Sequence, residues 1–209
     1  LAGILTIHDF LGFTNLFGID IDAALPITVT RSWHLQLALL WISACWIGAS
    51  IFVLSTANDQ DPPKQVTLVN LLFGLVVVLV VGSAIGEYLG PMGYLGEMWN
   101  LLGHQGWEFV ELGKLWQGLL FVVFMLWAAI IARAVIPLWR QGDSWTLPKW
   151  LLYSVVAILI LFLSGFVAKP TTNFVIADFW RWAVIHMWAE AFFEVFATIV
   201  LAYFMVLMG

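Results

Sequence analysis

The sequence predicts an all-α integral membrane protein with about five transmembrane helices, and three observations support this fold class. Hydrophobic residues make up 63% of the chain and charged residues only 10%, whereas soluble domains contain roughly 25% charged residues. Mean hydropathy is correspondingly high, at +0.99. The apolar stretches reach the ~20 residues that a helix needs to cross a bilayer, and they lack the alternation of barrel strands. The lipid bilayer is therefore the first expected partner.

The helical elements follow in order along the chain. Residues 1–32 are expected to form an interfacial approach segment, because Gly, Asp and Pro interrupt any long helix there. Residues 33–209 are expected to form the transmembrane helical domain. Its apolar spans are Trp33–Leu54, Val66–Ile85, Leu115–Ile136, Trp150–Val167 and Phe179–Met208. Lys and Arg are balanced between the two sides of these spans, so the positive-inside rule does not orient the chain.

Composition and the chain ends narrow the class further. The net charge of -5 argues against a nucleic-acid partner. The single Cys45 excludes a disulfide framework and a cysteine-based zinc or iron–sulfur site within this chain. The sequence begins at Leu1 without a signal-peptide pattern and ends at Gly209 without a polar flank. We therefore expect a part of a longer polypeptide or of a larger assembly.

The fifth span carries three ionisable residues at a spacing of four: His186, Glu190 and Glu194. In an α-helix this spacing places each side chain about 40° round from the previous one and one turn higher. Ionisable groups in hydrocarbon cost several kcal/mol unless they face a partner, a metal or water. One interpretation is structural, with His186 bonded to a carbonyl and both carboxyls protonated between helices. A metal or proton-handling stripe is favoured, and the hard carboxylate suits iron better than a soft-ligand copper site.

Other candidate residues lie nearer the amino terminus. His34 opens the first span and is either an interfacial histidine bonded to a loop or an axial haem ligand. Gln36 is a candidate buried polar residue that could bridge helices, and Glu87 is expected at a solvated helix end. Glu108 and Glu111 are three residues apart, which fits either surface charge or an oxygen-ligand site for a hard cation such as Ca²⁺. No role is assigned to the remaining loop histidines, His8 and His104.

Four segments resemble the catalytic subunit of respiratory nitric oxide reductases, within the haem-copper oxidase superfamily. They are RSWHLQLALLWI (31–42), GSAIGEYLG (82–90), GWEFVELGKLWQ (106–117) and FWRWAVIHMWAEAFFEVFAT (179–198). The resemblance is closest to the quinol-dependent kind and extends from about Val29 to the end of the sequence. Oxidases of the superfamily carry a histidine followed by a tyrosine four residues later on the last of these helices. Here Glu190 stands in the place of that tyrosine, as in the nitric oxide reductases.

The resemblance implies a site and a location. His34 would be an axial ligand of a low-spin haem b, while His186 and Glu190 would bind a non-haem iron that faces a high-spin haem b. Glu190 and Glu194 would be the catalytic carboxylates. Glu108 would bind calcium with support from Glu111. The chain would form part of a larger haem-copper-oxidase-like bundle in the cell inner membrane, and its substrate would be NO.

Three departures from the family pattern leave alternatives open. The family's other haem and iron ligands would lie beyond Gly209, in the rest of the polypeptide or in other membrane subunits. Pro26 and Thr30 occupy the positions where quinol-dependent members carry a histidine and a glutamate, so quinol as the electron donor stays open. The amino-terminal span and soluble region typical of the quinol type are also absent. The alternatives are a nitric oxide dismutase, which forms N₂ and O₂, and a non-catalytic membrane subunit.

Overall fold

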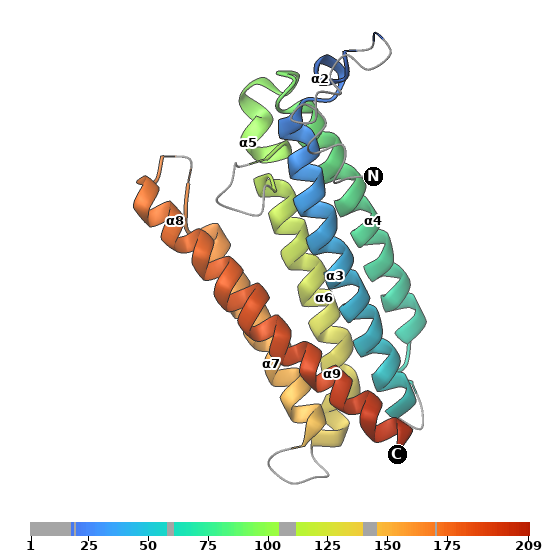
Figure 1. Ribbon diagram of the computed structural model, residues 1–209. Helices are drawn as coiled ribbons and strands as arrows, with labels where there is room; N and C mark the ends of the chain where they lie inside the picture. Colours follow the sequence, from blue (N-terminus) through green and yellow to red (C-terminus); the bar gives the residue numbers. More distant parts are fainter. Residues whose placement is uncertain (1–17, 19, 58–60, 105–111, 140–145, 170) are drawn as a thin grey trace. The chain divides into compact units, whose positions relative to one another are not determined.

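The computed structural model describes every residue except 1–17, 19, 58–60, 105–111, 140–145 and 170, and its regular secondary structure there is entirely helical (Figure 1). The first half contains α2 (Ile21–Ala24), α3 (Ile27–Ala57), α4 (Gln65–Leu89), the 3₁₀ turn η2 (Gly96–Met98) and α5 (Trp99–Leu102). The second half contains α6 (Lys114–Trp139), α7 (Leu147–Phe162), the 3₁₀ turn η4 (Leu163–Phe166), α8 (Phe174–Trp182), the π-helix η5 (Ala183–Phe192) and α9 (Phe193–Met208). The expected all-α fold class is therefore confirmed.

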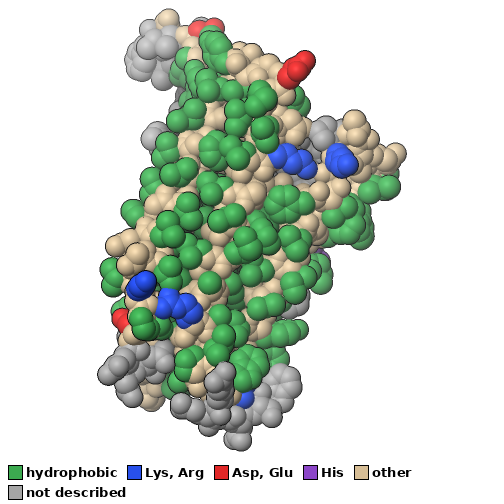
Figure 2. Space-filling model, turned by 180° about the vertical axis from the view of Figure 1, so that it is seen from behind, with side chains coloured by type: hydrophobic (Ala, Val, Ile, Leu, Met, Phe, Trp, Pro, Cys, Tyr) green, Lys and Arg blue, Asp and Glu red, His purple; other side chains and the backbone are tan. Residues whose placement is uncertain are grey.

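Within the described residues, four helical stretches are long and apolar enough to cross a membrane. They are Ile27–Ser55, Gln65–Leu89, Lys114–Trp139 and Leu147–Phe166. These agree with the first four predicted spans, and α9 is a shorter apolar helix. Hydrophobic side chains also cover most of the face shown in Figure 2, where charged side chains are few. The protein is thus a multi-pass membrane protein.

The first span begins earlier than the sequence predicts. Helix α3 starts at Ile27, six residues before Trp33. Proline is tolerated at a helix start, because the amide groups of the first turn have no intrahelical acceptor and the missing N–H of Pro26 is not needed there. The Pro26 carbonyl accepts hydrogen bonds from the amides of Val29 and Thr30, at 2.9 and 3.2 Å. Residues 27–32 therefore belong to the helix that was expected to follow them.

The predicted fifth span is also built differently from one continuous α-helix. Residues 174–182 are α-helical, residues 183–192 form the π-helix η5, and α-helical winding resumes at Phe193. A π-helix closes its hydrogen bonds at i+5, is rare, and frequently occurs at functional sites. The change of winding coincides with the segment that carries His186 and Glu190.

Contacts divide the described chain into two units. Unit 1 consists of Leu1–Ile42 and Val78–Gln117, and unit 2 consists of Ser43–Val77 and Gly118–Gly209. In unit 1, the Trp33 indole donates to the Ala84 carbonyl at 2.9 Å and joins α3 to α4. The Trp116 indole donates to the Leu102 carbonyl at 2.6 Å and joins α6 to α5. Leu102 is the last residue of α5, where a carbonyl has no intrahelical donor, so the Trp116 indole satisfies this oxygen.

Unit 2 is built around an aromatic core. The ring of Trp127 lies edge-on to Phe196 at 5.0 Å between centroids, and Phe124 lies edge-on to Phe162 at 5.5 Å. All four rings are fully buried. The Trp127 indole also donates to the Ser50 hydroxyl at 3.1 Å, which links α6 to α3. Helix α7 packs against both η5 and α9, so it supports the segment that holds the candidate site.

Candidate metal centre

The structure brings two of the three predicted residues of the fifth span together. The Nδ1 atom of His186 lies 3.0 Å from the Oε2 atom of Glu190. Both side chains project outward from unit 2, with 68% and 55% of their surfaces exposed. In water an exposed ion pair of this spacing stabilises a helix by only about 0.3–0.5 kcal/mol. The pair therefore contributes little to the stability of the fold.

The donor atoms of this pair suit a metal ion. Imidazole nitrogen and carboxylate oxygen are ligands that first-row transition metals accept, and the carboxylate favours a harder ion such as iron. If both bonds had a length of about 2.1 Å, as for zinc, adjacent ligands at a right angle would be about 3.0 Å apart. The separation of Nδ1 and Oε2 is compatible with this arrangement without a change of rotamer. Two ligands are fewer than a closed metal site needs.

Glu194 follows in a different type of helix. It lies exposed in the first turn of α9, and its backbone carbonyl accepts a hydrogen bond from the Thr198 hydroxyl at 2.9 Å. The sequence predicted that His186, Glu190 and Glu194 would be evenly spaced on an α-helical stripe. That geometry is wrong, because η5 is π-helical and its wider turn changes the rotation between residues four apart. Among the described residues, no group of three His, Cys, Asp or Glu side chains is placed to hold a metal.

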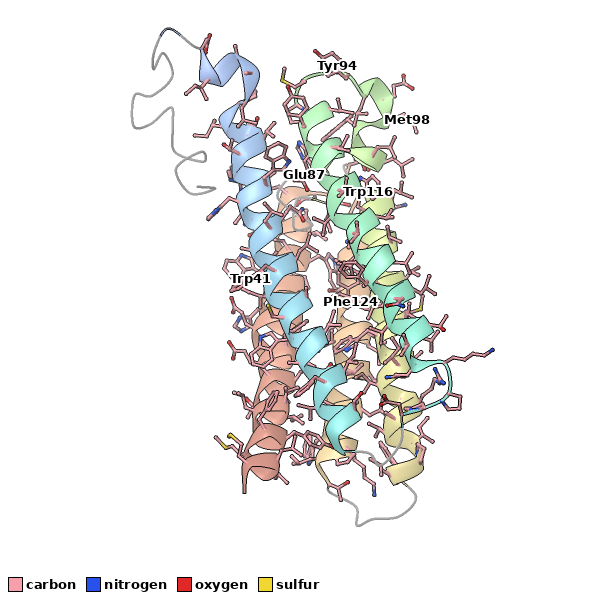
Figure 3. All side chains as sticks on the ribbon, turned by 90° about the vertical axis from the view of Figure 1, so that its right-hand side faces the viewer. Trp41, Glu87, Tyr94, Met98, Trp116 and Phe124 are labelled. Atoms are coloured by element: carbon pink, nitrogen blue, oxygen red, sulfur yellow. The ribbon has the colours of Figure 1, made fainter. Side chains whose placement is uncertain are left out.

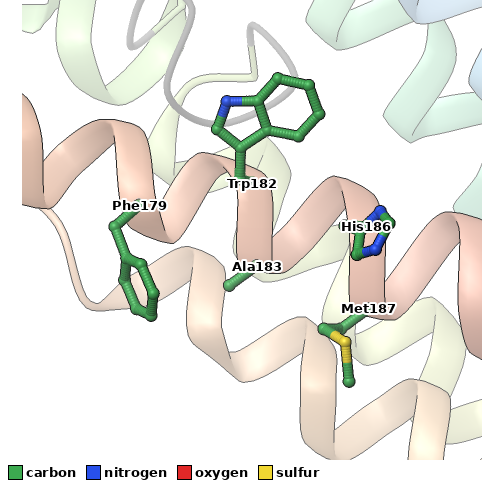
Figure 4. A pocket seen from close by; sticks show the side chains of 5 residues that line it. All are labelled: Phe179, Trp182, Ala183, His186 and Met187. Carbon is green, nitrogen blue, oxygen red and sulfur yellow. The ribbon is translucent and has the colours of Figure 1, made fainter.

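An apolar pocket of about 420 Å³ adjoins His186 (Figure 4). Its other lining residues are Phe179, Trp182, Ala183 and Met187. They recur along α8 and η5 at steps of three, one and four residues, a helical periodicity that places them on one face. The pocket was not predicted from the sequence, although that periodicity is visible there. The pocket gives the imidazole apolar neighbours on the side facing α8.

The remaining predicted residues stand apart from this pair. His34 is exposed on α3 in unit 1, so its imidazole is available to a group outside that unit. His104 is half-buried, with its ring edge-on to Trp99 at 5.5 Å between centroids. Glu108, Glu111 and His8 lie outside the described residues. The ligand roles given to His34, Glu108 and Glu111 stay predictions.

Glu87 is not at a solvated helix end, and the expectation from the sequence is wrong here. Its side chain is fully buried. Helix α4 continues to Leu89, and Leu102 and Gly103 lie against the helix at Gly86. The backbone amide of Gly113 donates to the Gly103 carbonyl at 3.0 Å. The sequence contains one indication of this burial. Ser83, four residues earlier on an otherwise apolar helix, is a second polar residue on the same face, and it is also buried.

The apolar spans and the outward His186–Glu190 pair define a class: a multi-pass helical membrane protein with a candidate metal-ligand pair in one of its helices. Residues 3–209 match the protein family described as Cytochrome C and Quinol oxidase polypeptide I. The match covers nearly the whole chain, so the chain belongs to this family.

The sequence is also similar to a curated protein from the group that the sequence motifs resemble. A protein of Stutzerimonas stutzeri that is named as a nitric oxide reductase subunit is 22% identical over 200 residues. The alignment covers 94% of this chain and 40% of the relative, so the chain spans less than half of that protein's length. The resemblance to nitric oxide reductase catalytic subunits is thereby confirmed.

Proposed function

We propose that the chain is part of the catalytic subunit of a respiratory nitric oxide reductase. The reaction couples two molecules of NO with two electrons and two protons to give one N₂O and one water. The observation that carries the proposal is the His186–Glu190 pair, with a nitrogen and an oxygen donor 3.0 Å apart on one helical segment. The similarity to the nitric oxide reductase protein of Stutzerimonas stutzeri supports the same assignment.

His186 and Glu190 would hold a non-haem iron through Nδ1 and Oε2. Together with a high-spin haem b, this iron would supply the two metal positions at which NO binds and is reduced. The carboxylate of Glu190 is a hard, anionic ligand, so it would favour the ferric over the ferrous ion. Glu194, four residues further on, would accept or donate a proton near the same centre. The apolar lining of the pocket beside His186 suits a small uncharged substrate.

The other cofactors would be held in unit 1 and by the rest of the protein. The exposed imidazole of His34 would be an axial ligand of a low-spin haem b. Glu108 would bind calcium, with Glu111 in support. The electrons would come from a donor such as quinol, and the membrane would be the cell inner membrane.

The outward position of the fifth-span residues supports a further polypeptide partner. A charged side chain facing lipid costs about 2.5–3.5 kcal/mol at the centre of a helix. His186, Glu190 and Glu194 are all exposed in the chain taken alone. We therefore propose that the rest of the catalytic polypeptide, or another membrane subunit, covers this face and completes the ligand set.

A second candidate function is nitric oxide dismutation, in which two NO molecules give N₂ and O₂ without an external donor. One observation favours it. Thr30, which stands where quinol-dependent enzymes carry a glutamate, is buried, and its hydroxyl donates to the Ile27 carbonyl of its own helix. Pro26, at the other position, contributes only a backbone carbonyl that accepts from the first helical amides. Neither residue offers an ionisable group to a quinol.

The deciding experiment is NO consumption by the purified intact protein under strict anoxia, with mass-spectrometric detection of N₂O, N₂ and O₂. It is run with and without a reduced quinol. Quinol-dependent N₂O formation is the expected result. N₂ and O₂ without a donor would identify the dismutase instead. No NO consumption by a preparation that retains its haem spectrum would favour a non-catalytic subunit.

A further inference from the structure

Two basic residues of unit 2 meet at the turn where α4 begins. Arg133 lies on α6, six residues before the end of that helix at Trp139, and its guanidinium donates a hydrogen bond to the Pro63 carbonyl. Lys64 follows Pro63 directly, and its side chain is exposed. Figures 1 and 3 show the start of α4 beside the last turns of α6. This turn therefore carries an ammonium group of its own and receives a guanidinium group from a second helix.

Arg133 belongs to a membrane-spanning helix. Helix α6 is one of the stretches that are long and apolar enough to cross a bilayer, and Arg133 is half-buried on it. Charged side chains are rare in such spans, and an arginine near a helix end extends its guanidinium towards the membrane surface. The hydrogen bond to Pro63 shows this direction, because Pro63 lies in the turn before the first residue of α4. The guanidinium therefore lies at the level of the lipid headgroups.

Aromatic side chains mark the same end of the spans. Helix α4 begins, α6 ends and α7 begins at this end, because successive spans cross the membrane in opposite directions. Trp139 lies at the end of α6, and Trp150 and Tyr153 lie in the first turns of α7, with their rings edge-on at 5.7 Å between centroids. All three side chains are exposed. Tryptophan and tyrosine are enriched at the headgroup level of membranes, so this end of unit 2 meets the polar surface of the bilayer.

Lys64 has an unusual backbone conformation for a lysine. Its φ angle is 61°, and in the described part of the chain it is the one residue other than glycine with a positive φ. Left-handed backbone is unfavourable for residues with a Cβ, and glycine and asparagine adopt it more readily. The turn is closed by the Gln65 amide, which donates to the Pro62 carbonyl at 3.1 Å. Backbone geometry therefore does not explain a lysine at this position, whereas its positive charge does.

The two basic side chains fit the phosphate group of a lipid. A guanidinium has five N–H donors in a planar fork that matches the oxygens of a phosphate, and the bond to the Pro63 carbonyl uses one of these donors. A lysine ammonium binds phosphate as a point charge. Asp61 is exposed and adds one negative charge, so the described part of this turn has an excess of positive charge. Phospholipid phosphates are the anions that the bilayer offers at this level.

We propose that Arg133 and Lys64 form a binding site for the phosphate of an anionic phospholipid, in the leaflet at which α4 begins. The guanidinium supplies directional hydrogen bonds, and the ammonium adds the second positive charge. A headgroup with a net negative charge, such as phosphatidylglycerol, binds in preference to zwitterionic phosphatidylcholine, because the choline cation is repelled by the same two side chains. The proposal is independent of the reaction assigned to the protein.

Lipid titration followed by native mass spectrometry tests the site on the intact purified protein after bound lipid has been removed. Phosphatidylglycerol and phosphatidylcholine with the same acyl chains are compared. The wild type should bind phosphatidylglycerol about 10-fold more tightly, and higher ionic strength should reduce this difference. Equal affinities for the two lipids would overturn the proposal. Displacement of phosphatidylglycerol by millimolar inorganic phosphate would also overturn it, because the site would then bind a free anion.

Substitutions show whether these two residues carry the preference. Arg133→Gln should lower the affinity for phosphatidylglycerol by at least about 10-fold, because the amide is neutral. Lys64→Asn removes the other charge, suits the left-handed backbone and leaves the bond from Arg133 to Pro63 in place. It should therefore lower the affinity in a fully folded protein, and it decides the question if Arg133→Gln reduces the folded yield. Lys64→Arg should keep wild-type affinity.

Lys169→Gln is the matched control. Lys169 is also an exposed lysine of unit 2, but it follows η4 and so lies at the opposite end of the spans. Its substitution should leave the affinity for phosphatidylglycerol unchanged. An equal loss of affinity in Lys169→Gln and Lys64→Asn would show a general effect of surface charge and would refute a site at the start of α4.

Discussion

The Nδ1 atom of His186 and the Oε2 atom of Glu190 lie 3.0 Å apart across four residues of a π-helical segment. Neither side chain is buried, and an exposed pair of this kind adds only a few tenths of a kcal/mol to the fold. A contribution to stability therefore explains the presence of this pair poorly, and the binding of a metal ion explains it better. Substitutions in the fifth span can separate these two roles.

Replacement of the carboxylate ligand should abolish metal binding without damage to the fold. We expect Glu190→Gln to retain the haem absorption spectrum and its folded yield, because the pair contributes little to stability. It should lose the non-haem iron and at least about 100-fold of NO turnover, as the amide is a neutral and weaker ligand. Iron per protein, measured by mass spectrometry, and NO consumption at an electrode provide the check. Wild-type iron content in this variant would refute the assignment.

Glu194 should behave differently from Glu190. It lies in α9 and outside the contact that joins His186 to Glu190, so Glu194→Gln should keep the iron. Turnover should fall by about 10–100-fold, which is typical when a residue that supports a metal site is removed. Iron content and NO consumption are measured on the same preparation. Loss of iron together with activity would show that Glu194 is itself a ligand.

His34 should be required for the low-spin haem. Its imidazole is exposed on α3, and His34→Ala should remove the low-spin haem absorption from the reduced spectrum. His104→Ala is the matched control, because that half-buried imidazole is already packed edge-on against Trp99. The control should keep the spectrum. A low-spin signal of normal intensity in His34→Ala would exclude His34 as an axial ligand.

The sequence predicts the spans well and their ends less well. Continuous apolar runs report the bilayer thickness directly, which is why four predicted spans agree with the structure. The beginning of α3 at Ile27 was missed, because it depends on hydrogen bonds from the amides of Val29 and Thr30 to the Pro26 carbonyl, which hydropathy does not show. Glu87 was misplaced as well: it is fully buried, and the burial of a helix end depends on tertiary packing that a local sequence pattern does not contain.

The candidate site was predictable in its residues and unpredictable in its backbone. A spacing of four between His186 and Glu190 suggests that both residues bind the same metal ion. The structure places these two side chains together. The π-helical winding of Ala183–Phe192 has no counterpart in local sequence pattern, since no Pro or Gly marks it. The continuous α-helix assumed for His186, Glu190 and Glu194 was therefore wrong, because the winding changes between Glu190 and Glu194.

The packing of α4 gives a test of the fold with an internal control. A Cβ at Gly86 would overlap the Leu102 carbonyl oxygen, a backbone atom that cannot turn away as a side chain can. Gly86→Ala should therefore force α4 and α5 apart and destabilise the protein by about 1–3 kcal/mol, as overpacking does. For a protein of this size, that corresponds to a fall in Tm of several degrees.

Gly74 is on the same helix, and a Cβ there meets nothing within 4 Å. Gly74→Ala should be neutral or stabilising by up to about 1 kcal/mol, because alanine favours the helix. Both Tm values are measured by circular dichroism on the intact protein in one detergent. Equal Tm values for the two variants would mean that the close approach of Leu102 to Gly86 is absent in solution. A fall confined to Gly86→Ala would establish that this glycine lets α5 approach α4 closely.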